Sequence, residues 1–334
     1  MTLSARPAKT QAELGVALDL AASVFREGDA LPGAVRHKSR LLSPTHAIEP
    51  YQCIVVHDNG MIIGTAFLVT RDFVFPDRVR QGTYLTSICM SSDARGRGVS
   101  RLLMETTLAH AQALGSEVAL VVARRAVDHY YLQFGFHGVS QYARTEIQTL
   151  TGLQTSEVCD ARLVRHGPAV GNGFSLPLGP LSELYAQTYH GQAGACLRDE
   201  AVWHFIDWKM ADRDCELHTL EDETAYAIHR GGDVFELGAR DSEAYSRLLD
   251  ALSRQTGAAS LKLHSVSADH PVHRVLGERD HGVTKRQCSY GGHMICMLDD
   301  RTLDRISLCG RLGLSHSLGQ DGGQSFNLLY MDES

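Results

Sequence analysis

The sequence predicts a mixed α/β fold, of the α+β kind with mixed sheets, built as two similar modules. A length of 334 residues exceeds one ordinary mixed domain and suits two. A hydrophobic share of 43% with only 21% charged residues is typical of a globular chain. Helix-like and strand-like patterns also follow one another twice in a similar order. We therefore expect a first domain at 1–155, a linker at 156–179, and a second domain with a C-terminal extension at 180–334.

The first predicted elements are a helix and an antiparallel hairpin. Residues 10–13 have the spacing of a capping box, and apolar residues follow at helical intervals as far as Phe25. Two β-prone runs, 53–56 and 61–69, are separated by a short turn that contains the Asn-Gly pair at 59–60. Because Asn-Gly favours tight hairpin turns, these runs are expected to pair with each other.

A glycine-rich loop separates the next strand from the next helix. Residues 84–90 have strand character, and 100–114 carry an apolar stripe at helical spacing that ends at Gly115, a C-cap residue type. The apolar run 118–123 predicts a buried strand, and a tyrosine-rich segment follows at 128–136. The loop therefore lies between the end of a strand and the start of a helix.

The second half repeats this order of elements. Gly and Pro concentrate at 167–179, which is typical of a linker. The elements predicted after it are helices at 181–189 and 200–210, a hairpin of 224–229 and 234–237, a helix ended by Gly257, a strand at 260–264 and a short helix opened by Pro271. The two halves therefore look like diverged copies of one α/β module.

Charge, hydropathy and cysteine usage argue against several classes of protein. A formal net charge of −7 argues against a general nucleic-acid binder. The chain has neither a long apolar run nor a basic start followed by an apolar stretch, so we expect no membrane binding and no export. The eight cysteines stand singly, as expected in a reducing cytoplasm. The oligomeric state is left open, with a homodimer as one alternative.

The glycine-rich loop is also the predicted anion site. Three arginines and no acid lie between Ala94 and Arg101. A helix start offers unpaired N–H groups and a partial positive charge, and glycines let the chain curl around a phosphate. No G-x-x-x-x-G-K-[ST] string exists, and Arg101 stands where a dinucleotide fingerprint needs Gly or Ala. The loop therefore matches neither the P-loop of nucleotide-binding proteins nor the dinucleotide-binding fingerprint.

The loop resembles the R-x-x-G-x-G/A signature of the GNAT acetyltransferases, with Arg95 and Gly98 in place and Ser100 at the third position. The resemblance implies that the loop holds the pyrophosphate of acetyl-coenzyme A, the expected cosubstrate. It also implies that the preceding strand diverges from its neighbour and pairs with the pantetheine arm. The residues assigned to coenzyme binding on this basis are Ile88, Cys89, Met90, Arg95, Gly96, Arg97, Gly98, Val99 and Ser100.

A second match to the same family, Y-x-x-x-G-F, begins at Tyr131. In GNAT proteins this tyrosine hydroxyl lies near the thioester sulfur, so the resemblance assigns Tyr131 as the acid that protonates the departing thiolate. The alternative for Tyr131 is a packed aromatic residue, and Phe134 and Phe136 are expected in the core.

The second half lacks the phosphate chemistry. Residues 238–243 include Asp241 and Glu243 and no G-x-G, so this module is expected to bind no coenzyme. As a whole, the chain resembles tandem GNAT proteins of the enhanced-intracellular-survival type, in which a degenerate module shapes the acceptor pocket. Those proteins have a third domain, whereas only a short segment follows Leu298 here.

The expected reaction is direct transfer of an acetyl or other acyl group to a primary amine of a small molecule. The sequence identifies neither the general base, the acceptor nor the acyl chain length. A non-catalytic acyl-coenzyme A binding or regulatory protein is one alternative, and a protein lysine acetyltransferase is another.

A metal site and a cysteine nucleophile are both disfavoured. The most suggestive histidines are His264, His270 and His273, but there is no H-E-x-x-H motif and Pro271 marks a helix start. No metal is therefore expected. Cys89 is expected to be a buried structural cysteine.

Overall fold

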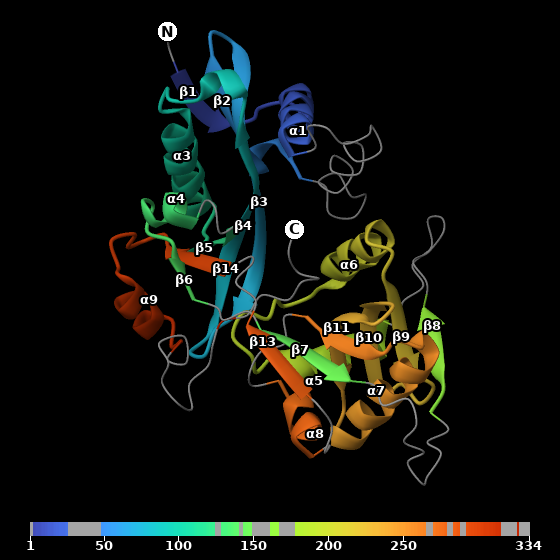
Figure 1. Ribbon diagram of the computed structural model, residues 1–334. Helices are drawn as coiled ribbons and strands as arrows, with labels where there is room; N and C mark the ends of the chain where they lie inside the picture. Colours follow the sequence, from blue (N-terminus) through green and yellow to red (C-terminus); the bar gives the residue numbers. More distant parts are fainter. Residues whose placement is uncertain are drawn as a thin grey trace.

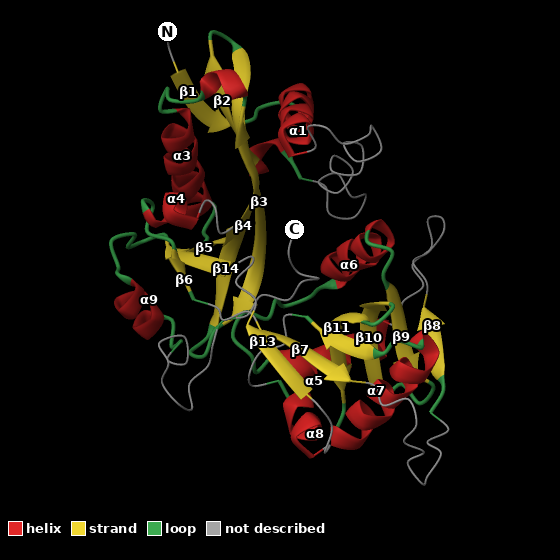
Figure 2. Cartoon of the chain, in the orientation of Figure 1, coloured by secondary structure: helices red, strands yellow, loops and turns green. Residues whose placement is uncertain are grey.

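The strands form two seven-stranded sheets, each covered by helices on both faces (Figures 1 and 2). The predicted mixed α/β class is confirmed, because each sheet contains both parallel and antiparallel pairs. None of the described helices is long and apolar enough to cross a membrane. The computed structural model describes residues 3–25, 48–123, 128–139, 143–148, 161–166, 178–264, 270–278, 283–287, 292–314 and 326.

The first sheet is antiparallel except where β4 and β5 run parallel. Its strands in spatial order are β1 (Leu3–Pro7), β2 (Cys53–Asp58), β3 (Met61–Val74), β4 (Val79–Met90), β5 (Val118–Ala123), β14 (Gly292–Met297) and β6 (His137–Gly138). One face packs on α1 (Gln11–Phe25), and the other packs on α3 (Val99–Ala113) and α4 (Asp128–Leu132). Helix α9 (Arg305–Arg311) lies beside β6 (Figure 1). Short 3₁₀ turns precede β2 (Pro50–Gln52) and follow β4 (Ser92–Ala94).

The first helix and hairpin form where their local signals predict them. The Thr10 hydroxyl accepts a hydrogen bond from the Glu13 amide at 3.2 Å, as in a capping box. Between β2 and β3, Asn59 and Gly60 have φ angles of 49° and 82°. A tight hairpin turn needs this left-handed conformation at both positions, and Asn and Gly tolerate it best.

The second sheet is antiparallel except where β11 and β12 run parallel. Its strands in spatial order are β13 (Val283–Gln287), β7 (Ala143–Gln148), β12 (Ser260–Leu263), β11 (Asp233–Ala239), β10 (Ala225–Arg230), β9 (Glu216–Leu220) and β8 (Leu163–His166). Helices α5 (Leu178–Tyr189) and α6 (Glu200–Asp212) pack on one face, with α7 (Ser242–Thr256) and α8 (Val272–Glu278) on the other. The order β9, β10, β11, α7, β12, α8 repeats that of β2, β3, β4, α3, β5, α4.

The two sheets exchange strands. β7 follows the first sheet's strands in sequence, yet it lies between β12 and β13 of the second sheet. β14 follows the second sheet's strands, yet it lies between β5 and β6 of the first. Each sheet is therefore completed by a strand from the other half of the chain.

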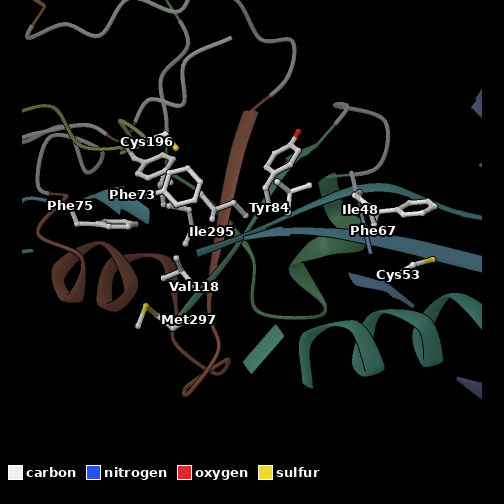
Figure 3. Close-up of a cluster of buried hydrophobic side chains, with 14 of the residues drawn as sticks. Ile48, Cys53, Phe67, Phe73, Phe75, Tyr84, Val118, Cys196, Ile295 and Met297 are labelled. Atoms are coloured by element: carbon white, nitrogen blue, oxygen red, sulfur yellow. The ribbon is translucent and has the colours of Figure 1, made fainter. Parts of the chain in front are cut away.

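The buried core of the first sheet also draws on both halves. Phe73 and Val118, from β3 and β5, pack in one cluster with Ile295 and Met297 of β14 (Figure 3). Cys196, from the segment before α6, belongs to the same cluster and forms a backbone bridge with Phe73. Separating the halves would therefore expose this core.

The sheets do not follow the predicted domain boundaries. β7 lies within the predicted first domain at 1–155 but belongs to the second sheet, and β14 lies within 180–334 but belongs to the first. β8 lies in the predicted linker at 156–179 and is an edge strand of the second sheet. Local patterns predict that a segment is a strand, but long-range pairing decides which sheet it joins.

Candidate active site

β4 and β5 separate part-way along their length. They pair only at residues 82–84 and 118–120. β4 then continues to Met90 without pairing with β5, while β5 stays paired with β14 as far as Ala123. The predicted divergence of the strand that precedes the glycine-rich loop is therefore observed.

A bulge lies in β4 beyond the point of separation. Thr86 pairs with Phe67 and Cys89 pairs with Thr65, so two residues of β4 stand opposite a single residue of β3. Ser87, one of the two, has a φ of 50°. A bulge bends its strand and re-aims the following side chains. Here the bulge comprises Ser87 and Ile88, immediately before Cys89 and Met90.

The loop after β4 leads into an uncapped helix start. Gly96 and Gly98 have φ angles of 73° and 76°, and an added Cβ would meet no atom within 4 Å at either position. The backbone conformation, rather than crowding, therefore favours glycine there. Gly98 is the N-cap of α3 and supplies no side-chain hydrogen bond. The first N–H groups of α3, from Val99 and Ser100, therefore receive no side-chain cap from Gly98, as at a helix start that can bind an anion.

The three arginines near this loop differ in their ion pairs. The Arg97 guanidinium lies 2.6 Å from the Asp58 carboxylate, which is only 8% exposed. Arg101 pairs with Glu105 one turn along α3, at 2.8 Å and in solvent. Arg95 is exposed and forms no ion pair with any residue that the structure describes. Its charge is therefore available to an incoming anion, whereas Arg97 ties the loop to the β2–β3 hairpin.

Tyr131 lies on α4 and packs edge-on against the rings of Tyr130 and Phe136, at centroid distances of 5.3 and 5.8 Å. Burial raises the pKa of the Tyr131 phenol above its usual value, so the hydroxyl stays protonated at neutral pH. No partner for this hydroxyl exists among the residues that the structure describes. The side chain is thus both partly packed and able to donate a proton.

Sequence reasoning missed the role of Tyr130. Its hydroxyl donates a 2.9 Å hydrogen bond to the Ser100 carbonyl in the first turn of α3, and burial raises its pKa to about 12. The bond fixes α4 against the helix start. The Tyr-Tyr pair in the sequence was the available signal, but it does not show which hydroxyl is bonded.

The end of α4 is packed as expected. Phe134 and Phe136 are buried in the core beneath α3. Gly135 has a φ of 84°, and an added Cβ would collide with the Arg301 carbonyl. The backbone conformation and the lack of space for a side chain therefore both favour glycine at this position of the Y-x-x-x-G-F match.

Residues 5–139 match the family model of the acetyltransferase (GNAT) domain. This segment of the chain is therefore a GNAT acetyltransferase domain. It is an acyltransferase that uses acyl-coenzyme A. A search of curated proteins finds no match.

Several solved structures share the fold of this chain. A GCN5-related N-acetyltransferase from Kribbella flavida is 19% identical with a TM-score of 0.68, covering 89% of this chain and 71% of that one. Eis1 from Mycobacterium abscessus is also 19% identical, with a TM-score of 0.61 and coverage of 89% and 74%. A probable N-acyltransferase from Enterococcus faecalis is 13% identical, with a TM-score of 0.67 and coverage of 89% and 73%. At these identities the likeness shows the fold.

Cys89 of the GNAT domain lies in the core. Its side chain is buried, and burial raises the pKa of its thiol to about 12. A thiol with that pKa stays protonated at neutral pH. The interpretation of Cys89 as a buried structural residue is therefore confirmed.

The second module of this chain fills the matching position with its own side chains. β11 and β12 pair only at Asp233–Lys262 and Val234–Leu263 and then separate. Beyond that point the Leu237 carbonyl accepts hydrogen bonds from the Tyr189 hydroxyl at 2.7 Å and from His270 at 3.2 Å. The Leu237 amide donates to the same hydroxyl at 3.3 Å. The amide and carbonyl of Leu237 are therefore already hydrogen-bonded and are not available to pair with an extended ligand.

The helix start of the second module is capped by a side chain. Asp241 is the N-cap of α7, and its carboxylate accepts a hydrogen bond from the Ala244 amide at 2.8 Å. A negative charge at this position repels a phosphate. The equivalent residue of the first module, Gly98, offers no such group.

Proposed function

We propose that this chain transfers an acetyl group from acetyl-coenzyme A to a primary amine of a small molecule, directly and within a ternary complex. The observation that carries the proposal is the edge of β4, released from β5, leading into the uncapped start of α3. Loop residues 95–100 are proposed to bind the pyrophosphate, and residues 88–90 are proposed to pair with the pantetheine arm. A single anion site needs several N–H groups together, because each charge at a helix start contributes only about 0.3 to 1 kcal/mol.

The proposed chemistry needs one acid on the enzyme. The neutral amine attacks the thioester carbon, the C–N bond forms, the C–S bond breaks, and the amine loses a proton to water. Tyr131 gives its phenolic proton to the departing thiolate and regains one from solvent. Its burial favours the protonated phenol that this role requires. Holding both substrates in one complex lowers the entropic cost of the reaction.

The acceptor class follows from weaker observations. A net charge of −7 favours encounter with a cationic amine. We propose no nucleic-acid or membrane partner and no metal in the transfer step, and we propose a cytoplasmic location. The six described cysteines are all free, which is consistent with a reducing compartment. A homodimer remains one alternative for the assembly.

A thiol-release assay tests the proposed function. Acetyl-coenzyme A is supplied with a panel of amino sugars, polyamines, amino acids and amino-nucleotides, and free coenzyme A is measured. Amine-dependent release supports the proposal. Release that requires a protein substrate, with acetyl-lysine found by mass spectrometry, would instead support a protein acetyltransferase. Coenzyme binding without turnover on any amine would support a non-catalytic regulatory protein.

A further inference from the structure

Three side chains able to ligate a metal lie together in the second module. Glu216 and His218 come from β9 and His229 from β10, and one ligand atom of each lies within 4.8 Å of the other two. Both histidines are buried, at 0% and 2% exposure. The Glu216 side chain is 34% exposed, so the cluster can be reached from solvent.

The strand register brings these residues to one face of the sheet. His229 pairs with Glu216 across β9 and β10, and His218 lies two residues beyond Glu216 on β9, so all three side chains share a face. A bulge between Ile228 and His229 interrupts the pairing of β10 with β11. Bulges commonly re-aim a side chain toward a site, and this one lies at a candidate ligand.

Hydrogen bonds orient both imidazole rings. His229 Nδ1 lies 3.0 Å from the Gly231 carbonyl oxygen, so this nitrogen carries a proton and donates it. His229 Nε2 therefore has a lone pair, and it lies 2.8 Å from His218 Nδ1. His218 Nε2 lies 2.7 Å from the side-chain amide of Gln255, in the last turn of α7. Without a metal, a chain of hydrogen bonds runs from Gln255 through His218 to His229, and both imidazole rings are neutral.

We propose that this cluster binds one divalent transition-metal ion of the zinc class, with His218 Nδ1, His229 Nε2 and a Glu216 carboxylate oxygen as ligands. The ion takes the place of the proton between the two rings. His218 loses its Nδ1 proton and gains one on Nε2, so the ring stays neutral. Once its amide turns, Gln255 accepts a hydrogen bond from the new Nε2–H group of His218 through its carbonyl oxygen, because an amide offers both a donor and an acceptor.

The surroundings suit a bound metal. A ligating histidine commonly donates its other ring N–H to a backbone carbonyl, as His229 does to Gly231. Two imidazoles and one carboxylate favour zinc, nickel or copper over magnesium and calcium, which prefer oxygen ligands. Glu216 is now held by the Arg165 guanidinium at 2.7 Å, and Arg165 is 61% exposed. Such an exposed pair is weak, so the carboxylate is free to turn toward the ion.

The cluster is separate from the residues weighed for metal binding in the sequence. Those were His264, His270 and His273, and none of them contributes a ligand here. The proposed ion would join β9 to β10, the two strands that supply its ligands. It takes no part in acyl transfer, so the proposal does not depend on the proposed function.

Zinc titration of the full chain tests the proposal. The chain is stripped with a chelator, and Zn²⁺ is titrated by calorimetry into wild type and Glu216→Gln. His204→Gln is the matched control, since His204 lies 3.6 Å from Glu200 on the surface of α6. We expect wild type and control each to bind one equivalent of Zn²⁺. The zinc affinity of Glu216→Gln should fall by more than the roughly 10- to 100-fold that loss of a group bonded to a metal ligand causes. Glu216 is partly exposed, so this variant should fold.

Visible absorption of Co²⁺ gives a second measurement that is independent of activity. Coordination by the cluster predicts a d–d band in wild type and in His204→Gln, and no band in Glu216→Gln or His218→Gln. The proposal is overturned if wild type binds no zinc, or if its affinity and the cobalt band survive in Glu216→Gln. In that case His218 and His229 are a hydrogen-bonded pair only.

Discussion

Tyr130 and Tyr131 are adjacent in sequence but have different hydrogen-bonding surroundings. The Tyr130 hydroxyl is bonded to the Ser100 carbonyl, whereas no described residue bonds the Tyr131 hydroxyl. A bonded phenol holds structure together, and an unbonded phenol can donate to a substrate. The two residues therefore form a natural pair of test and control.

Tyr131→Phe should lower kcat and leave coenzyme affinity within a few-fold, because a group that acts on the leaving thiolate affects turnover more than binding. The expected loss is roughly 10²- to 10⁴-fold, as for a lost acid catalyst. It would be smaller if thiolate departure is not rate-limiting. Since burial raises the Tyr131 pKa above about 10, deprotonation of this phenol should lower the rate only above that pH.

The matched control is Tyr130→Phe, measured with the same amine. It should keep kcat and lose about 1 kcal/mol of stability, the contribution of one hydrogen bond. A kcat for Tyr131→Phe within about threefold of wild type, far below the loss of a general acid, would return Tyr131 to a packing role.

Substitutions of two loop arginines should have different effects, one on coenzyme affinity and the other on stability. Arg95→Gln is expected to weaken coenzyme binding about two- to fivefold, the equivalent of roughly 0.3 to 1 kcal/mol for one charge near a helix start, without changing the melting temperature. Arg97→Gln should lower stability by about 1 to 3 kcal/mol, because it leaves the buried Asp58 carboxylate without its partner. Calorimetric titration and thermal melts check both. If both variants lost coenzyme affinity equally and neither changed the melting temperature, the different roles assigned to Arg95 and Arg97 would be contradicted.

At the scale of elements, the helix starts of α3 and α7 explain which module suits a coenzyme. The sequence predicted this difference, because the glycines of the first loop and the acids of the second are local features. It did not predict how β11 is blocked. Tyr189 and His270 lie far from Leu237 in sequence, and no local pattern shows that their side chains bond its backbone.

The sequence also predicted the existence of elements better than their partners. The hairpin at Asn59 and Gly60 and the C-cap at Gly257 depend on neighbouring residues, and both were predicted. The exchange of β7 and β14 depends on contacts between distant residues, so periodicity alone could not show it.

Removing the α7 cap should not create a coenzyme site. Asp241→Ala is expected to destabilise the chain by about 1 kcal/mol, the usual cost of a lost N-cap, while coenzyme stoichiometry stays unchanged. The reason is that the Leu237 backbone remains bonded by Tyr189 and His270. Thermal melts and calorimetry measure the two effects. Appearance of a second binding event in this variant would show that the cap alone closes the module.

At the scale of the whole molecule, the exchanged strands make the two halves interdependent. A fragment of residues 1–155 lacks β14, whose residues Ile295 and Met297 are buried against the first sheet. Without it, the edge of β5 is unpaired and apolar surface is exposed. We expect the fragment to aggregate or to melt without a cooperative transition. A fragment with a cooperative melt like that of the full chain would show that the first module folds alone.

Coenzyme A stoichiometry tests the central assignment most directly. Calorimetric titration of the full chain should give one equivalent, and Gly98→Glu should abolish binding by placing a carboxylate at the pyrophosphate site. Gly257→Glu is the control, because Gly257 also has a positive φ, of 57°, and open space at Cβ but lies at the end of α7. It should still bind one equivalent. Two equivalents in wild type, or unchanged affinity in folded Gly98→Glu, would contradict the assignment of coenzyme binding to the loop before α3.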